Sequence, residues 1–298
     1  MTVTTPDSAI ASPAGDVDPT GRSTKRRIPR VPTVVVVVVG LCALLAPVLS
    51  SYAQNGGSLL ATFIEPFGRD GAGALHVFGT DQNGRDIATR LLYGARSSLT
   101  VGLVGVLIAA AFGSAVGLVS GLVGRWVDAV LMRIVDIVLS VPPILIAILL
   151  AGTSRPSLAS VFFVIGVLLW PGYARLVRGE VLGIRTMDYV ELAKVAGCSR
   201  LTIARRHLLP NVLPSILVLA TVHVGTAIVL ESSLSFLGVG LPPDIASWGG
   251  MVNDGRGLLP IAWWPSVLPG LCIFVTVFAF NKLGDWARIR FDPRMDVA

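Results

Sequence analysis

The chain has 298 residues, of which 53% are hydrophobic and 14% are charged, and its formal net charge is +6. Soluble domains carry roughly a quarter of charged residues, so this composition excludes an ordinary soluble enzyme and indicates an integral membrane protein. In such a protein the excess of positive charge is better explained by basic loops on one membrane face than by nucleic-acid binding. The three cysteines, Cys42, Cys198 and Cys272, indicate neither a disulfide framework nor a metal site.

The chain opens with a polar stretch, residues 1–30, rich in Ser, Thr, Pro, Asp and Gly. Such a composition predicts a disordered tail. An almost uninterrupted apolar run follows at 33–50 and predicts a first spanning helix. The alternative is a secretory signal cleaved near Ser51-Tyr52-Ala53.

A polar connection, residues 54–96, leads to the second predicted span at 98–122. Its Asn83-Gly84 pair predicts a turn, and Asp81, Arg85 and Asp86 are close enough in sequence to form ion pairs. We interpret this connection as a capped loop that anchors the next helix, with contact to a ligand as the alternative. Within the span, small residues recur every four positions and predict a close helix-packing face. They are Gly113, Gly117 and Gly121.

The third predicted span, 127–151, contains Asp128, Arg133 and Asp136 and should be interrupted at Pro142-Pro143. Arg133 and Asp136 are three residues apart, so they share a helix face and could pair. At 1.5 Å per residue, Asp136 lies roughly 15 Å deep in a hydrocarbon core about 30 Å thick. An ionised group at that depth must be paired or face water.

Three further spans are predicted at 157–177, 213–237 and 267–283. The fifth contains His223, also near mid-membrane, and Glu231. Asp136 and His223 are therefore candidates for the lining of a pathway. Trp263 and Trp264, just before the sixth span, are placed where an interfacial aromatic belt is expected.

A polar, basic island at 178–212 separates the fourth and fifth spans. Glu191 and Ala193 belong to a helix-forming run, and Gly197 can adopt the positive φ that ends it. Ser199 is a suitable cap for a second short helix, and Pro210 either stops that helix or opens the next segment. Two short helices joined at a glycine need another surface to cover their apolar side.

The spacing Glu191-x-Ala193, Gly197, Leu209-Pro210 resembles the EAA loop of ABC importer permeases, although Leu192 and His207 depart from the general pattern. The run from Arg206 to Asn211 looks like the dipeptide/oligopeptide branch. In that family the loop docks on the ATPase, which makes these residues the candidate coupling site. They are Glu191, Ala193, Gly197, His207, Leu209 and Pro210.

The resemblance implies an all-α integral membrane protein with six transmembrane helices in the type I ABC importer permease architecture, spanning residues 31–298. It implies a multi-pass protein of a prokaryotic plasma membrane, with cytoplasmic termini. The implied partners are a homologous second permease, two ATP-binding subunits that hold ATP and Mg, an extracytoplasmic substrate-binding protein and membrane lipid. The implied cargo is a di- or oligopeptide, with nickel, glutathione or another small solute as the alternative.

Basic residues are distributed unequally between the two sides of the predicted topology. If the amino-terminal tail is cytoplasmic, 17 Lys and Arg residues fall on the inside and six on the outside. This asymmetry predicts that both termini and the island at 178–212 are cytoplasmic. The outer six are Arg69, Arg85, Arg90, Arg96, Arg155 and Arg256.

Sequence signals of catalysis are missing. No phosphate-binding loop occurs, so we expect that the chain binds no ATP and no other cofactor by itself. The usual marks of an intramembrane protease are also missing, and no catalytic residue or metal site is predicted. An ion-coupled secondary transporter that uses Asp136, His223 and Glu231 is the alternative from another class, but the chain lacks an internal repeat.

Overall fold

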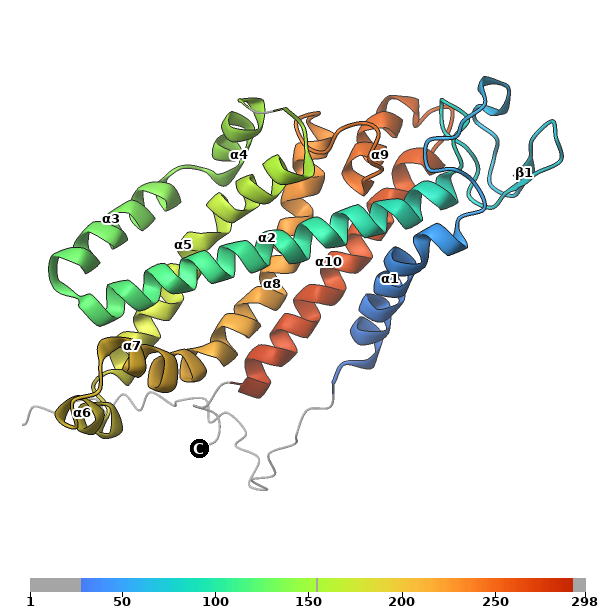
Figure 1. Cartoon of the computed structure of the whole chain (residues 1–298). Coiled ribbons are helices and arrows are strands. Elements are labelled where there is room, and N and C mark those ends of the chain that lie inside the picture. Colours follow the sequence, from blue (N-terminus) through green and yellow to red (C-terminus); the bar gives the residue numbers. More distant parts are fainter. Residues whose placement is uncertain (1–27, 154, 292–298) are drawn as a thin grey trace, which may run out of the picture.

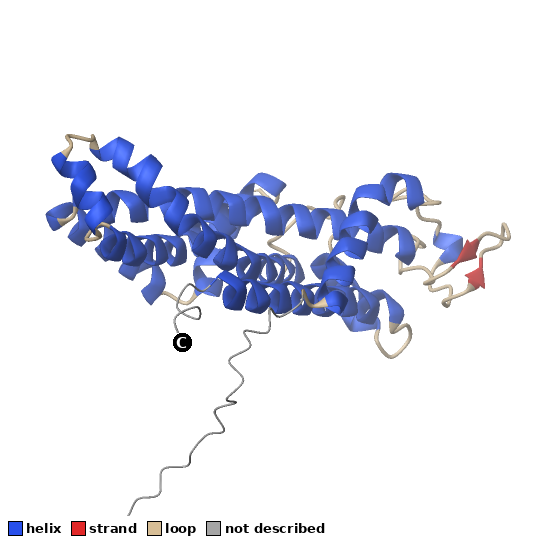
Figure 2. Ribbon diagram, turned by 90° about the horizontal axis from the view of Figure 1, so that it is seen from below, coloured by secondary structure: helices blue, strands red, loops and turns tan. Residues whose placement is uncertain are grey.

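The computed structural model describes residues 28–153 and 155–291, which form an elongated bundle of helices (Figures 1 and 2). The predicted disordered tail lies outside the described residues as far as residue 27. The main helices are α1 (Arg30–Leu49), α2 (Ile87–Val123), α3 (Arg125–Ser140), α4 (Pro143–Gly152), α5 (Leu158–Ile184), α6 (Asp188–Val195), α7 (Arg200–Ile203), α8 (Leu209–Phe236), α9 (Trp248–Gly255) and α10 (Trp264–Phe291). Short 3₁₀ turns lie at Leu59–Ala61 and Arg256–Leu258.

Five helical segments of the described chain are long and apolar enough to cross a membrane, and the α3–α4 pair could make a sixth. This agrees with the predicted all-α membrane fold. The axes of α3 and α4 differ by 89°, so the segment predicted as a third span at 127–151 is a broken one. Val141 and Pro142 are extended at the break, because a residue that precedes proline avoids the helical region.

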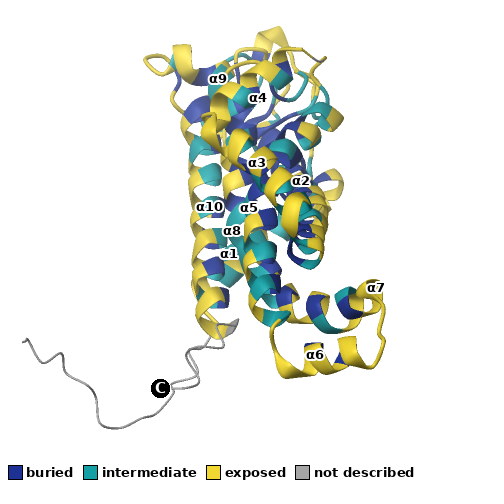
Figure 3. Ribbon diagram, turned by 90° about the vertical axis from the view of Figure 1, so that its left-hand side faces the viewer, coloured by how far each residue is buried: buried dark blue, intermediate teal, exposed yellow. Residues whose placement is uncertain are grey.

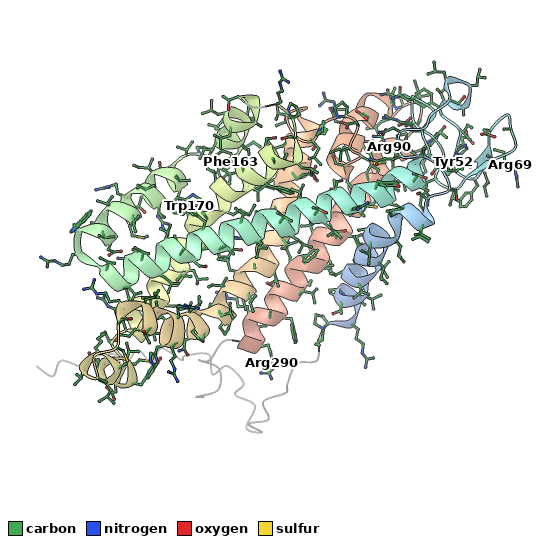
Figure 4. The ribbon with its side chains drawn as sticks, in the orientation of Figure 1. Tyr52, Arg69, Arg90, Phe163, Trp170 and Arg290 are labelled. Carbon is green, nitrogen blue, oxygen red and sulfur yellow. The ribbon has the colours of Figure 1, made fainter. Side chains whose placement is uncertain are left out.

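The longest helix, α2, crosses α5 at the glycine face predicted from the sequence (Figure 1). A Cβ atom on Gly113 would lie 2.3 Å from the Trp170 carbonyl oxygen, and one on Gly117 would lie 2.6 Å from that of Ala174. The two backbones can approach this closely only because the glycines have no side chain. Figure 4 labels Trp170 on the α5 side of this contact.

Several helices extend beyond their predicted ends. The second span begins at Ile87 rather than at residue 98, because the Asp86 carboxylate accepts a hydrogen bond from the Thr89 amide and caps the helix there. The fourth span continues to Ile184 rather than ending at residue 177. The fifth is continuous with α7, so the apolar candidate span is Arg200–Phe236 rather than 213–237.

The hairpin end of the bundle contains the connection between α1 and α2, with strands β1 (Gly68–Arg69) and β2 (Leu75–His76) paired antiparallel (Figure 2). His76 is buried there between the Tyr52 ring, stacked at 4.9 Å, and Asp86, whose Oδ2 is 2.9 Å from its Nδ1. Partial desolvation and the charge of Asp86 raise the pKa of the Tyr52 hydroxyl, which donates to the Leu75 carbonyl.

The prediction that both tryptophans face the membrane interface is wrong for Trp264 and stays a prediction for Trp263. Trp263 is half-exposed, but Trp264 is buried and its indole N–H donates to the Thr80 carbonyl at 3.0 Å. The ring of Trp264 therefore fastens α10 to the α1–α2 connection instead of facing the lipid interface. An indole can serve either purpose because it combines a large apolar body with one donor.

Candidate coupling loop and polar sites of the bundle

The α6 helix ends in a glycine-dependent motif. Gly197 has φ of 80°, and its amide donates to the Lys194 carbonyl at 3.0 Å. The next amide, that of Cys198, donates to the Ala193 carbonyl at 3.0 Å. These two bonds form the Schellman motif that closes a helix with a left-handed residue. The Ser199 hydroxyl then caps α7 by accepting from the Thr202 amide, so the helix–glycine–helix geometry expected from the sequence is present.

The second helix of the island runs directly into the membrane helix. Between α7 and α8 lies a π-helical turn, η2 (Ala204–Leu208), in which the Leu209 amide donates to the Ala204 carbonyl. Pro210 has no N–H and its ring clashes with the carbonyl four residues earlier, which explains the wider turn at this point. Pro210 therefore opens α8 and does not separate it from the island.

The unit formed by residues 188–208 projects from the end of the bundle opposite the hairpin (Figures 1 and 3). Leu192, Val195 and Leu201 are 68%, 87% and 67% exposed. Tyr189 is also exposed, whereas Val190, Ala193 and Ile203 are buried and hold α6 against α7. Large apolar side chains that project this far from the spans indicate a contact surface for another protein.

The other residues of the predicted coupling site are divided between surface and interior. Glu191 is exposed and makes no ion pair with any described residue. His207 is half-buried, and its ring lies 6.0 Å from that of Tyr189. Ala193 is buried, whereas Leu209 and Pro210 are exposed at the start of α8. Four of the six site residues thus belong to the unit at 188–208, whereas Leu209 and Pro210 follow it at the start of α8, and the six do not form one surface.

Two ion pairs join α3 to α5. The Asp128 carboxylate receives two hydrogen bonds from Arg178, at 2.5 and 2.7 Å, and a third from the Ser120 hydroxyl. Asp136 receives one bond, from Nη2 of Arg175 at 2.6 Å. The predicted Arg133–Asp136 pair is therefore wrong, since the α3–α5 crossing brings Arg175 to Asp136 and leaves Arg133 exposed.

His223 lies at the contact between α5 and α8. Its ring meets that of Tyr173 edge-on, with the centroids 5.0 Å apart, and a Cβ on Gly172 would lie 3.4 Å from its Cε1. The buried Nδ1 of His223 and the buried hydroxyl of Tyr173 have no hydrogen-bond partner among the described residues. His223 and Asp136 are thus on different helices with different neighbours, and their place in a pathway stays a prediction.

Glu231 is fully buried near the hairpin end of α8. Its carboxyl group accepts hydrogen bonds from Ser98 of α2 at 3.1 Å and from Ser235 at 2.8 Å. The Ser235 hydroxyl in turn accepts from the Leu241 amide at 3.3 Å. The cluster therefore links α2 and α8 to the chain that leads to α9. No sequence pattern predicts that these serines meet Glu231.

A second polar cluster joins the start of α2 to α9 at the hairpin end, where Figure 4 labels Arg90. The Asp81 carboxylate receives bonds from Arg85 at 2.7 Å and Arg90 at 2.9 Å, and both guanidinium groups lie within 3.6 Å of Asp254. The local Asp81–Arg85 pair was predicted, but the parts played by Arg90 and Asp254 were not. No group of three or more His, Cys, Asp and Glu side chains in 28–153 and 155–291 could hold a metal ion.

Residues 113–297 match the family model described as the binding-protein-dependent transport system inner membrane component. The chain belongs to this family. The matched range includes the glycine face, both α3–α5 ion pairs and the whole α6–α7 unit. The resemblance inferred from the island at 178–212 is therefore confirmed at the level of the family.

Named relatives of this family match almost the whole chain. The dipeptide transport system permease protein DppC of Alkalihalophilus pseudofirmus is 39% identical over 91% of this chain and 87% of its own. DppC of Haemophilus influenzae is 35% identical over 88% and 89%. The glutathione transport system permease protein GsiD of Pectobacterium atrosepticum is 37% identical over 88% and 87%. This chain is accordingly a permease subunit of an ABC transporter assembly.

Solved structures agree on the fold. An inward-facing conformation of the MetNI methionine ABC transporter matches with a TM-score of 0.56 and 19% identity, over 68% of this chain and 97% of that chain. An amino acid ABC transporter matches with a TM-score of 0.51 and 16% identity, over 68% and 94%. At this identity the likeness supports the permease architecture alone.

Proposed function

We propose that this chain forms half of the translocation pathway of an ATP-driven importer for di- and oligopeptides and couples to the ATPase through residues 178–212. The observation that carries the coupling role is the projecting α6–α7 unit with its exposed Leu192, Val195 and Leu201. The peptide cargo is supported by relatives such as DppC, and GsiD makes glutathione, itself a peptide, the alternative cargo.

The proposed assembly contains a homologous second permease, two ATP-binding subunits and an extracytoplasmic substrate-binding protein, in a prokaryotic plasma membrane. Nucleotide and Mg belong to the ATP-binding subunits, because this chain has no phosphate-binding loop. We also propose that α1 is retained as a membrane helix. Two observations support this: α1 packs on α2 and α10, and the Tyr52 ring, just after the end of α1, stacks on the His76 ring.

Coupling would follow from the continuity of the helices. When ATP closes the two ATP-binding subunits, the surfaces that hold α6 and α7 move with them. Through η2 the displacement of α7 reaches α8 without an intervening loop. On the other side, Nζ of Lys194 donates to the Arg185 carbonyl at 3.0 Å and ties α6 to the end of α5. The displacement would thus reach both α5 and α8, the two helices that meet at Tyr173 and His223.

The decisive experiment is transport by the reconstituted assembly. Proteoliposomes that contain both permeases and the ATP-binding subunits, with the binding protein outside, should accumulate radiolabelled dialanine only with ATP inside. Uptake of glutathione but not of dialanine would replace the proposed cargo by the alternative. Accumulation driven by an ion gradient without ATP would overturn the proposed function.

Orientation can be tested with one native cysteine. Cys198 is exposed beside Gly197, whereas Ala72 is exposed at the tip of the β1–β2 hairpin. In chains without Cys42 and Cys272, Cys198 should react with a membrane-impermeant maleimide only after the cells are opened. With Cys198 also removed, Ala72→Cys should react in intact cells. The reverse labelling pattern would refute the proposed topology.

A further inference from the structure

The two ion pairs between α3 and α5 differ in how many of their donor and acceptor atoms have a hydrogen-bond partner. The Asp128–Arg178 pair is partly buried, bidentate and supplemented by Ser120, so both carboxylate oxygens are occupied. In the Asp136–Arg175 pair a single bond joins Oδ1 to Nη2, and the side chains are 52% and 53% exposed. Among the described residues, Asp136 Oδ2 and the other two nitrogens of Arg175 have no partner. One pair is closed and the other is open.

The charged atoms that the open pair leaves uncovered are costly to place against lipid. Charged groups within a span are costly unless they are paired or in contact with water, and half of each side chain of the open pair is uncovered. The closed pair next to it already joins α3 to α5, so a second structural link would not need free donors and acceptors. The exposed atoms of Asp136 and Arg175 therefore require water or a polar surface as their neighbour in the assembly.

We propose that Asp136 and Arg175 form a two-point subsite for the charged ends of zwitterionic cargo, which rests on the proposed function as a peptide importer. The free Oδ2 of Asp136 would accept from the cargo ammonium group. The free guanidinium N–H groups of Arg175 would donate to the cargo carboxylate, since five donors in a fork suit that group.

The pairing of the two residues with each other explains how such a subsite can be weak. Without cargo, each charge is neutralised by its neighbour, so no isolated charge is left in the span. Cargo exchanges the water on the unused atoms for hydrogen bonds of its own, so the net gain from binding is small. A pathway must bind its cargo well enough to admit it and weakly enough to release it, and a self-neutralised pair meets both needs.

The test uses a reporter that leaves the pair intact. Ser140 is exposed one turn after Asp136, on the same face of α3. In a chain without its three native cysteines, Ser140→Cys should react with a water-soluble maleimide in the complete assembly held in nanodiscs. We expect a Kd of about 1 mM for dialanine. Dialanine at about twice this concentration should occupy about two-thirds of the sites and slow the reaction roughly threefold. N-acetyl-dialanine amide, which has the same backbone without end charges, should not slow it.

Two variants distinguish a cargo subsite at Asp136 and Arg175 from a merely structural link between α3 and α5. Asp136→Asn with Arg175→Gln removes both charges but keeps a polar side chain at each position, and dialanine should no longer protect the reporter. Ser120→Ala loosens only the closed pair and should leave protection unchanged. If the double variant does not assemble, the subsite is tested by the chain with the intact pair, in which dialanine should protect the reporter and its capped analogue should not.

Three results would overturn the subsite: no reaction of the reporter, equal protection by the capped peptide, or protection that persists in the neutral pair. The dialanine uptake assay distinguishes these results from a failure of the proposed function. Uptake without protection removes the subsite alone. The absence of ATP-driven uptake of any peptide removes the importer function itself.

Discussion

Replacing Gly113 and Gly117 together by alanine should prevent the chain from accumulating as a folded membrane protein. The added Cβ atoms would lie 2.3 and 2.6 Å from backbone carbonyl oxygens of Trp170 and Ala174. A backbone oxygen inside a helix cannot rotate away, so α2 and α5 would have to separate. Overpacking costs typically about 1–3 kcal/mol at each site. Membrane levels and the thermal unfolding of the purified assembly measure the effect.

The matched control lies within α5 itself. Gly179 and Gly183 have the same spacing, and a Cβ on either would meet no atom of the described chain within 4 Å. Alanine is the better helix former by roughly 1 kcal/mol, so Gly179→Ala with Gly183→Ala should keep or raise the level of folded protein. Equal losses from the two double variants would mean that glycine acts here through helix flexibility and not through the close approach of α2 to α5.

The features that the sequence predicted well depend on local chemistry. The glycines of α2 recur every four residues, and this spacing alone places them on one face. Gly197 follows a helix-forming run and precedes a capping serine, so its left-handed conformation could be expected from its neighbours. The break before α4 follows from Pro142-Pro143 in the same way.

The features that the sequence did not predict depend on contacts between distant segments. Arg133 is three residues from Asp136, but the crossing of α3 and α5 selects Arg175, which is 39 residues away. Trp264 meets Thr80 across 184 residues. These pairs depend on the angle and position at which the helices cross, and neither the helix period nor the composition predicts them. From the sequence, Asp136, His223 and Glu231 could be identified as polar residues of the spans, but their partners could not.

The continuity of α7 with α8 was missed for a different reason. Proline is usually a sign that a helix ends, and Pro210 stands at the boundary of a polar and an apolar segment. The π-helical turn before it accommodates the missing N–H without ending the helix. The result bears on function, because a continuous helix transmits a displacement that a flexible loop would absorb.

Gly197→Val should uncouple the ATPase from transport while the chain still reaches the membrane. No atom lies within 4 Å of a Cβ built on Gly197, so the substitution creates no clash and acts only through φ. A β-branched residue is strained at φ of 80°, and the left-handed region costs roughly 1–2 kcal/mol even for ordinary residues. The Schellman bonds from Gly197 and Cys198 would then be lost, and α6 would no longer be held at its angle to α7.

Gly197→Asn is the matched control, since asparagine adopts the left-handed conformation more readily than valine. We expect ATP-driven uptake to fall about tenfold or more in Gly197→Val, because 1.36 kcal/mol corresponds to a factor of ten, and to stay near wild type in Gly197→Asn. Co-purification of the ATP-binding subunits should fall in parallel with uptake. If Gly197→Val retained both uptake and co-purification, the α6–α7 unit could not be the coupling site. If it lost uptake and membrane level together, its defect would be one of folding, and the Schellman motif would matter for stability rather than for coupling.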